Sequence, residues 1–253
     1  MMPASIWSES AAVPAIDDIA ALVDRYARAL AAYQRNAQTT AIWADVSWMT
    51  TCIDSGIDHG DHPGFAWIQS AVPRLEKRHI SAISLALLNR LKIRHPNLNA
   101  LVGPCWSSLD TIPVAMGVRV LRARALIFRR MEVRRLLDVR SRVRLSEWAG
   151  MPIEPFVFEC PGAPDIASLA LTARIPPLHR LDADALSREG LALLLRDLDA
   201  ERPPFPLLRL SFEQDLRLPE WLRQIDRALD RDGSARLMEG LPEWLKGWGW
   251  VFG

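Results

Sequence analysis

Two histidines and two aspartates lie within five residues of one another, in the segment Asp58-His59-Gly60-Asp61-His62. Imidazole nitrogens and carboxylate oxygens are common ligands of zinc and of paired metal ions in proteins. His59 and His62 are therefore the strongest candidates for metal-dependent hydrolysis. A polar loop in which the aspartates and the glycine form turns accounts for the same residues without any chemistry.

The spacing of these residues approximates the His-x-His-x-Asp-His signature of metallo-β-lactamase-type hydrolases. Here the position of the first histidine holds Ile57, and the preceding residues, 51–56, are not an apolar strand. The chain also contains neither a Gly-x-Ser-x-Gly nucleophile elbow nor a glycine-rich phosphate loop. We therefore expect no enzyme activity, no bound metal and no cofactor, and we keep the hydrolase as a third alternative.

A run of arginines is the second candidate. Ten arginines but only two acidic residues occur between Arg119 and Arg144. At about 100° per helical residue, several of them share one side of a helix. Guanidinium groups arranged in this way can bind phosphates or an acidic protein surface. We predict a basic ridge that binds a partner, formed by Arg119, Arg122, Arg129, Arg130 and Arg134.

Two other interpretations of the arginine run stay open. The stretch from Asp182 to Glu243 is rich in acidic residues, so the arginines could pair with the C-terminal half of the same chain. A helical nucleic-acid-binding protein could use the Arg119–Arg144 segment, although the net charge of only +1 disfavours general binding to nucleic acid. Arg124 falls on the apolar side of its helix, which predicts a buried carboxylate or carbonyl partner for it.

Tryptophan is unusually frequent, with ten Trp against two Tyr. The segment Leu218-Pro219-Glu220-Trp221-Leu222 recurs as Leu241-Pro242-Glu243-Trp244-Leu245, and in each copy the proline is expected at a helix start. Because Trp is enriched in protein interfaces, we predict a second, aromatic partner surface. Its members are Trp221, Trp244, Trp248 and Trp250, for which burial in the core is the alternative.

Apolar residues spaced three and four apart predict that helices must position these side chains. The expected helices cover residues 17–36, 73–92, 113–137, 141–149, 165–172, 182–200 and 219–230. The first of them carries one apolar face that includes Ile19, Val23 and Leu30. Only Phe156–Phe158 resembles a short strand or hairpin. The predicted fold is mainly α, a compact multi-helix body.

Composition limits the remaining possibilities. The 253 residues are 49% hydrophobic and 24% charged, as in globular proteins. The longest apolar runs are far shorter than the roughly 20 residues of a membrane span, so we expect no direct membrane insertion. Three widely spaced cysteines favour the cytosol over an oxidising compartment. The Pro-rich stretch 151–164 divides a helical part, residues 1–150, from a second, 151–253, and we expect them to pack as one body.

The segments Gly117–Leu126, Arg134–Asp138 and Val143–Gly150 are similar to the central part of the SctK family. These are accessory proteins of bacterial type III secretion systems and include YscK, PscK, OrgA and MxiK; the Hrp-type branch fits best. The resemblance implies a non-enzymatic adaptor of the cytosolic sorting platform. Such an adaptor links the cytoplasmic domain of the inner-membrane ring protein SctD to SctQ-containing pods. It implies a cytoplasmic location peripheral to the inner membrane, and protein partners rather than nucleic acid.

Overall fold

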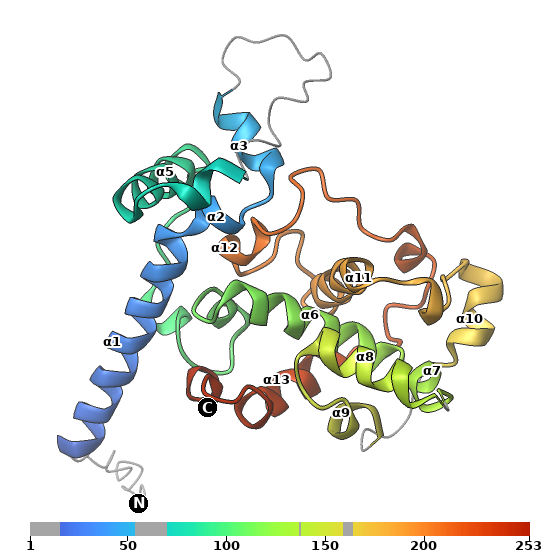
Figure 1. Ribbon diagram of the computed structural model, residues 1–253. Helices are drawn as coiled ribbons and strands as arrows, with labels where there is room; N and C mark the ends of the chain where they lie inside the picture. The colour runs from blue at the N-terminus through green and yellow to red at the C-terminus, as the bar shows by residue number, and fades with distance from the viewer. Residues whose placement is uncertain (1–15, 54–69, 137, 159–163) are drawn as a thin grey trace, which may run out of the picture.

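The computed structural model describes residues 16–53, 70–136, 138–158 and 164–253, and these ranges contain helices and no strand (Figure 1). The mainly α fold is therefore confirmed. The α-helices are α1 (Ile16–Gln38), α2 (Thr40–Trp43), α3 (Val46–Ile53), α5 (Lys77–Arg90), α6 (Val114–Phe128), α7 (Arg130–Arg134), α8 (Val139–Ala149), α9 (Glu154–Phe158), α10 (Ile166–Ala173), α11 (Ala183–Asp197), α12 (Pro206–Arg209) and α13 (Gly233–Trp244). Short 3-10 helices lie at Val72–Arg74, Leu98–Ala100, Trp106–Asp110, Leu178–Arg180, Glu220–Arg223 and Gly249–Val251.

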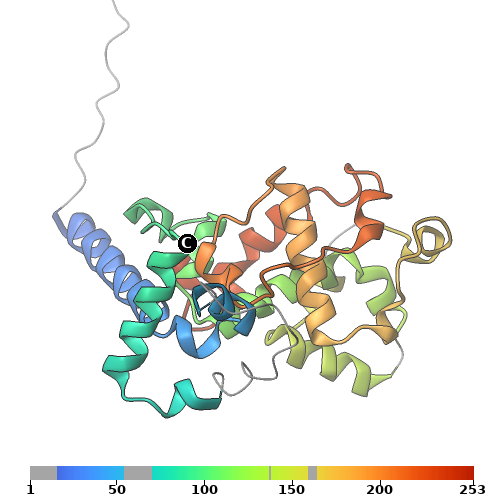
Figure 2. The ribbon, with the colours of Figure 1, turned by 90° about the horizontal axis from the view of Figure 1, so that it is seen from above.

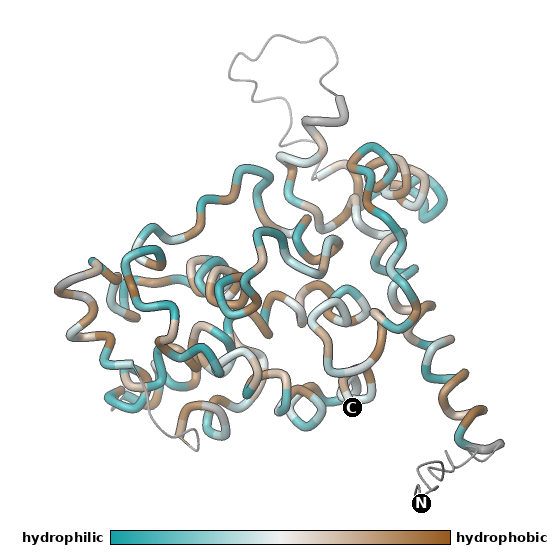
Figure 3. Tube along the Cα trace, turned by 180° about the vertical axis from the view of Figure 1, so that it is seen from behind, coloured by the Kyte–Doolittle hydropathy of each residue, from teal (hydrophilic) through white to brown (hydrophobic). Residues whose placement is uncertain are grey.

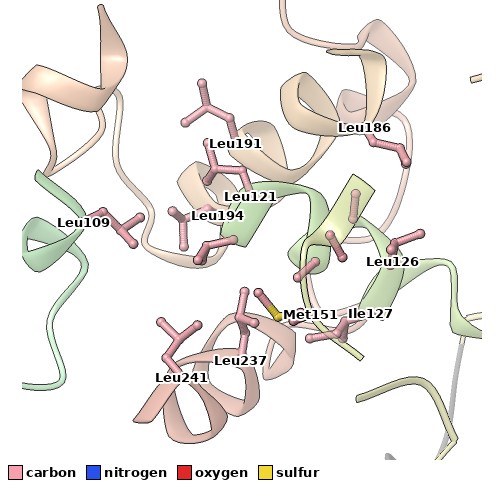
Figure 4. Packing of buried hydrophobic residues seen from close by; sticks show 14 of the residues in the cluster. Leu109, Leu121, Leu126, Ile127, Met151, Leu186, Leu191, Leu194, Leu237 and Leu241 are labelled. Carbon is pink, nitrogen blue, oxygen red and sulfur yellow. The ribbon is translucent and has the colours of Figure 1, made fainter. Parts of the chain in front are cut away.

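Helices α6 and α11 form the centre of the main core, and α13 packs beside them (Figures 1 and 4). The two central helices meet at backbone level: a Cβ added to Gly190 would lie only 1.7 Å from the carbonyl oxygen of Leu121. Leucines from all three helices fill the space between them, including Leu194 and Leu237. This core therefore draws on residues from both sides of position 150.

A second layer is built from α1, α2 and α5 at one end of the molecule (Figure 2). Its small core contains Tyr33 of α1 and Leu87 of α5, together with Leu207 of α12 and Leu210 directly after it, which connect it to the rest of the body. Asn36 of α1 donates hydrogen bonds to the backbone carbonyls of residues 110 and 112, at 2.8 and 2.7 Å. The C-terminal half of α1 is thus fixed to the core by apolar packing and by the hydrogen bonds of the Asn36 side chain.

A buried carboxylate lies at this junction. Both oxygens of Asp110 accept backbone hydrogen bonds at the start of α12, from the N–H groups of Leu207 at 3.1 Å and Leu208 at 2.8 Å. Burial raises the pKa of Asp110 to about 7, although these two hydrogen bonds favour the ionised form. Burial, and then the charge of Asp110, raise the pKa of Tyr33 to about 12.

We expect Asp110 to make the stability of the protein depend on pH. In the unfolded chain an aspartate ionises near its ordinary pKa of 3.8, whereas the folded protein holds this proton until about pH 7. Protonation of Asp110 therefore contributes its full share to the free energy of unfolding below about pH 4. This contribution, up to about 4 kcal/mol, is lost as the pH rises through 7. Urea denaturation of the wild type and of Asp110→Asn between pH 4 and 8 measures it. The difference in unfolding free energy between the two proteins should shrink as the pH rises; a constant difference would contradict the assignment.

Helix α8 shows why the sequence located some boundaries well. Asp138 accepts hydrogen bonds from the N–H groups of Arg140 and Ser141, at 3.1 and 3.0 Å, and so caps the first turn. The helix ends at Gly150, whose φ of 65° is left-handed and favours glycine. The predicted end is confirmed, and the Asp138 cap starts the helix two residues earlier than expected.

Four local expectations were wrong. The helix expected over 219–230 is only a short 3-10 helix at Glu220–Arg223. The long helix expected over 113–137 is broken at Arg129, where the chain turns from α6 into α7. Phe156–Phe158 is helical, in α9, because Pro155 suits a first helical turn and Val157 is buried against the main core. Pro242 lies inside the last turns of α13 and not at a helix start. Gly249 packs against the carbonyl oxygen of Pro242, so that a residue with a side chain would not fit at position 249.

Candidate partner-binding surfaces

The Arg124 guanidinium lies in the centre of the molecule, fully buried. It donates to Asp197 at 3.0 and 2.7 Å and to the Asp230 carboxylate at 2.9 Å. The hydroxyl of Ser234 accepts a further hydrogen bond from it at 2.8 Å. The predicted buried carboxylate partner is confirmed, and the network ties α6 to α11 and to the start of α13.

Arg129 and Arg130 are also buried, so the expectation that they belong to an exposed ridge was wrong. Arg129 donates two hydrogen bonds to Glu189, at 2.6 and 2.8 Å, and one to Glu132 at 2.7 Å. Burial alone would lower the pKa of Arg129, but the neighbouring carboxylates raise it, so the group stays charged. Arg130 donates to Asp230 at 2.7 Å. The acidic C-terminal half of the chain is what these two arginines bind.

Two further members of the predicted ridge are half-buried and held by backbone carbonyls. Arg122 donates to the carbonyl oxygens of residues 183 and 148 and to the hydroxyl of Ser187, at 3.0, 3.2 and 2.9 Å. Burial lowers the pKa of Arg122. Arg134 donates to the carbonyl of Val157 at 2.8 Å. Only Arg119 is exposed, with its side chain lying over Gly150. The five arginines therefore do not form one ridge, because α6 is a central helix.

The exposed basic surface lies instead on α8, and we call it the α8 face. It consists of Val139 and Val143, which are 70% and 50% exposed, and the exposed arginines Arg119, Arg140 and Arg144, with one exposed acid, Glu147, on the same side of the helix. None of these three arginines forms an ion pair with another residue of the described ranges. Beside it opens a cleft of about 880 Å³ between α8 and residues 150–154. The sequence contained a signal for this face. Two valines stand four residues apart and next to arginines, whereas the opposite side of the same helix is the one that buries Leu145.

The predicted aromatic surface divides in a similar way. Trp221 is buried and stacks on Phe128 with 5.7 Å between ring centroids, so its assignment to a partner surface was wrong. Trp244, Trp248 and Trp250 are all half-buried and pack against the main core. Trp248 and Trp250 also stack on each other, with 6.1 Å between ring centroids. Each of these three tryptophans keeps part of its surface open to solvent, where a partner could reach it.

Helix α1 meets this aromatic pair. The guanidinium of Arg28 lies 4.8 Å above the ring of Trp250, and Arg25 donates to the backbone carbonyl of Trp250 at 2.8 Å. A hydrogen bond from Tyr26 to Asn99, at 3.1 Å, adds one more contact. Polar and cation–π contacts therefore hold the middle of α1, whereas its buried apolar residues begin only at Ala29.

The N-terminal half of α1 projects from the body (Figure 1), and hydrophobic residues recur along it (Figure 3). Ile19 is 47% exposed, Val23 61% and Leu30 37%. The sequence placed these residues on one face with Tyr33, but the structure buries only Tyr33 in the core. We call this surface the α1 stripe; its members are Ile19, Ala20, Val23, Ala27, Leu30 and Ala31, all exposed. An uncovered apolar stripe of this length is typical of a binding surface.

The described residues offer little to catalysis. An apolar groove of about 430 Å³ runs between α11 and α12, and its described lining holds no Cys, His or Ser. Arg209 at its edge stacks on Trp48 at 5.0 Å and donates to three backbone carbonyls, so it is already engaged. Across the described ranges, no three His, Cys, Asp or Glu side chains are grouped so that they could hold a metal. His59 and His62 lie outside the described residues.

None of the described helices combines the length and the apolar character that crossing a membrane requires. Comparison with known proteins gives one family: the model described as "Bacterial type III secretion protein (HrpB4)" matches residues 20–246. No curated protein and no solved structure matches the chain significantly. The match extends from α1 to the end of α13, so it includes the α8 face and nearly all of the α1 stripe.

Proposed function

This chain belongs to the HrpB4 family of bacterial type III secretion proteins, and we propose that it is a non-enzymatic, SctK-like adaptor of the cytosolic sorting platform. In this role it links the cytoplasmic domain of the inner-membrane ring protein SctD to SctQ-containing pods. Its place is then cytoplasmic and peripheral to the inner membrane. The family match supports a role in type III secretion, and the surfaces of the helical body support the adaptor role.

The α8 face is the observation that carries this proposal. Two exposed valines next to arginines without ion-pair partners in the described ranges suit an acidic partner with an apolar contact. The C-terminal end of the chain, which carries the half-buried Trp248 and Trp250, lies away from α8 (Figure 1). The buried ion pairs of Arg124 and Arg129 hold the helices between these surfaces. A rigid body with two separate contact surfaces is what a linking protein needs.

The adaptor role predicts that the α8 face binds one of the two partners. Reversing two exposed charges with Arg140→Glu and Arg144→Glu should reduce capture of one partner at least tenfold and leave the other unchanged. The reason is that both side chains are exposed and unpaired, so the fold does not need them. Co-purification with the SctD cytoplasmic domain and with SctQ, each tested separately, measures the effect.

Arg227→Glu is the matched control, because Arg227 is an equally exposed arginine away from α8. Circular dichroism should show the same helix content in all variants. Undiminished capture of both partners by the double variant would remove the α8 face from the proposal, and a wild type that captures neither would contradict the adaptor role. Steeply salt-dependent binding of the wild type to duplex DNA would favour the nucleic-acid alternative instead.

A further inference from the structure

The α1 stripe is costly to leave in water. Its large residues Ile19 and Val23 lie in the part of α1, residues 18–28, in which no side chain is buried, and Leu30 is 37% exposed. An isolated helix as short as this projecting part of α1 is marginally stable in water. Most helices in proteins are stabilised by packing an apolar face against another element. The stripe carries no charged residue to compensate for its exposure. These features point to a second helix that covers it.

The stripe consists of two rows. At 100° per residue, the large residues form one row, and Ala20, Ala27 and Ala31 form a parallel row beside it. A row of alanines lets two helix axes approach closely, since the distance between packed helices depends on the side chains at the contact. Beyond the alanine row lie Asp24 and Arg28, which form an ion pair of 2.9 Å within α1 and are both largely exposed.

We propose that α1 pairs in antiparallel orientation with α1 of a second copy of this chain. A two-fold axis perpendicular to the helix, near residue 26, brings equivalent edges of the two helices together. The alanine rows then meet each other, and Ile19 lies within about one turn of the partner copy's Leu30. Asp24 directly faces the partner copy's Arg28, and the two copies of Asp24 lie about 6 Å apart along the axis.

Self-complementary charge is what identifies the occupant. The charged edge of α1 reads acidic at Asp24 and basic one turn later at Arg28, so reversing its direction sets opposite charges against each other. The two-fold axis makes this contact twice. Two short helices bury an area at the small end of the range for specific interfaces, so the association is weak and the dimer forms only at high protein concentration.

The apolar part of the proposal is tested on the purified full chain. Sedimentation equilibrium should show a monomer–dimer equilibrium for the wild type, and Val23→Glu should weaken association at least tenfold. Leu171→Glu is the matched control, because Leu171 of α10 is a large apolar residue that is 87% exposed away from α1. Its association constant should equal that of the wild type. A wild type that remains monomeric at every concentration, or equal effects of both substitutions, would overturn the proposal.

Charge exchange between copies tests the pairing itself. Asp24→Arg and Arg28→Asp should each weaken association at least tenfold when studied alone, because each places like charges across the two-fold axis. In the Asp24→Arg variant positions 24 and 28 are both positive, and in the Arg28→Asp variant both are negative. An equimolar mixture of the two variants therefore places opposite charges across the interface, and dimers should reappear. Both variants lack the ion pair within α1, so only a contact between copies explains such recovery, and its absence would exclude the antiparallel register. These measurements use no secretion partner, so they fail or succeed independently of the adaptor role.

Discussion

Replacing Gly190 with alanine is expected to unfold the protein or to lower its free energy of unfolding by about 3 kcal/mol or more. The new methyl group would lie 1.7 Å from the carbonyl oxygen of Leu121, and this oxygen belongs to the backbone of α6. No rotation of a side chain relieves that clash. Helices α6 and α11 would have to separate by more than about 1 Å, which opens the whole main core.

Gly117→Ala provides the matched comparison. Both glycines lie inside helices, so alanine improves helix propensity by roughly 1 kcal/mol at each position. At Gly117, however, the methyl group would meet only the end of the Leu208 side chain, at 2.8 Å, and that side chain can move. Urea denaturation followed by circular dichroism should therefore show a large loss for Gly190→Ala and a small change for Gly117→Ala. Similar losses for both would mean that the contact between α6 and α11 is not at backbone level.

Arg124→Met is expected to cost about 3–5 kcal/mol, although methionine has a similar length and is apolar. The substitution removes one of the two arginines that compensate each buried carboxylate, so that Asp197 keeps only Arg196 and Asp230 keeps only Arg130. It also removes the hydrogen bond to Ser234, so α6, α11 and α13 lose a common contact. The midpoint of chemical denaturation measures the effect.

Arg227→Met tests whether burial is the cause. Arg227 and Asp199 also form an ion pair, at 3.4 Å, but both side chains are more than 80% exposed. Solvent screens such a pair, so its loss should leave the denaturation midpoint nearly unchanged. If Arg124→Met lowers the denaturation midpoint as little as Arg227→Met does, the buried network around Arg124 does not hold α6, α11 and α13 together.

Local pattern determined much of the secondary structure. The spacing of apolar residues located α1, α5, α8, α10 and α11, because an amphipathic face and capping residues such as Asp138 and Gly150 act within a few residues of chain. The same approach failed at Phe156–Phe158, where a run of apolar residues does not distinguish a strand from a single buried helical turn. Of the helix expected over 219–230, only the 3-10 helix Glu220–Arg223 forms, and there Trp221 stacks on Phe128 from a distant segment.

The candidate sites were harder to predict for a physical reason. The sequence by itself determined a mainly α chain, a buried partner for Arg124 and the concentration of arginine before residue 150. Whether an arginine faces water or a carboxylate depends on side chains 60 to 110 residues away, such as Glu189 and Asp230. Only the tertiary structure, by placing α6 between α11 and α13, decided that Arg129 and Arg130 are buried. The same packing left the α8 face and the α1 stripe exposed, because a helix position becomes a surface only where no other element covers it.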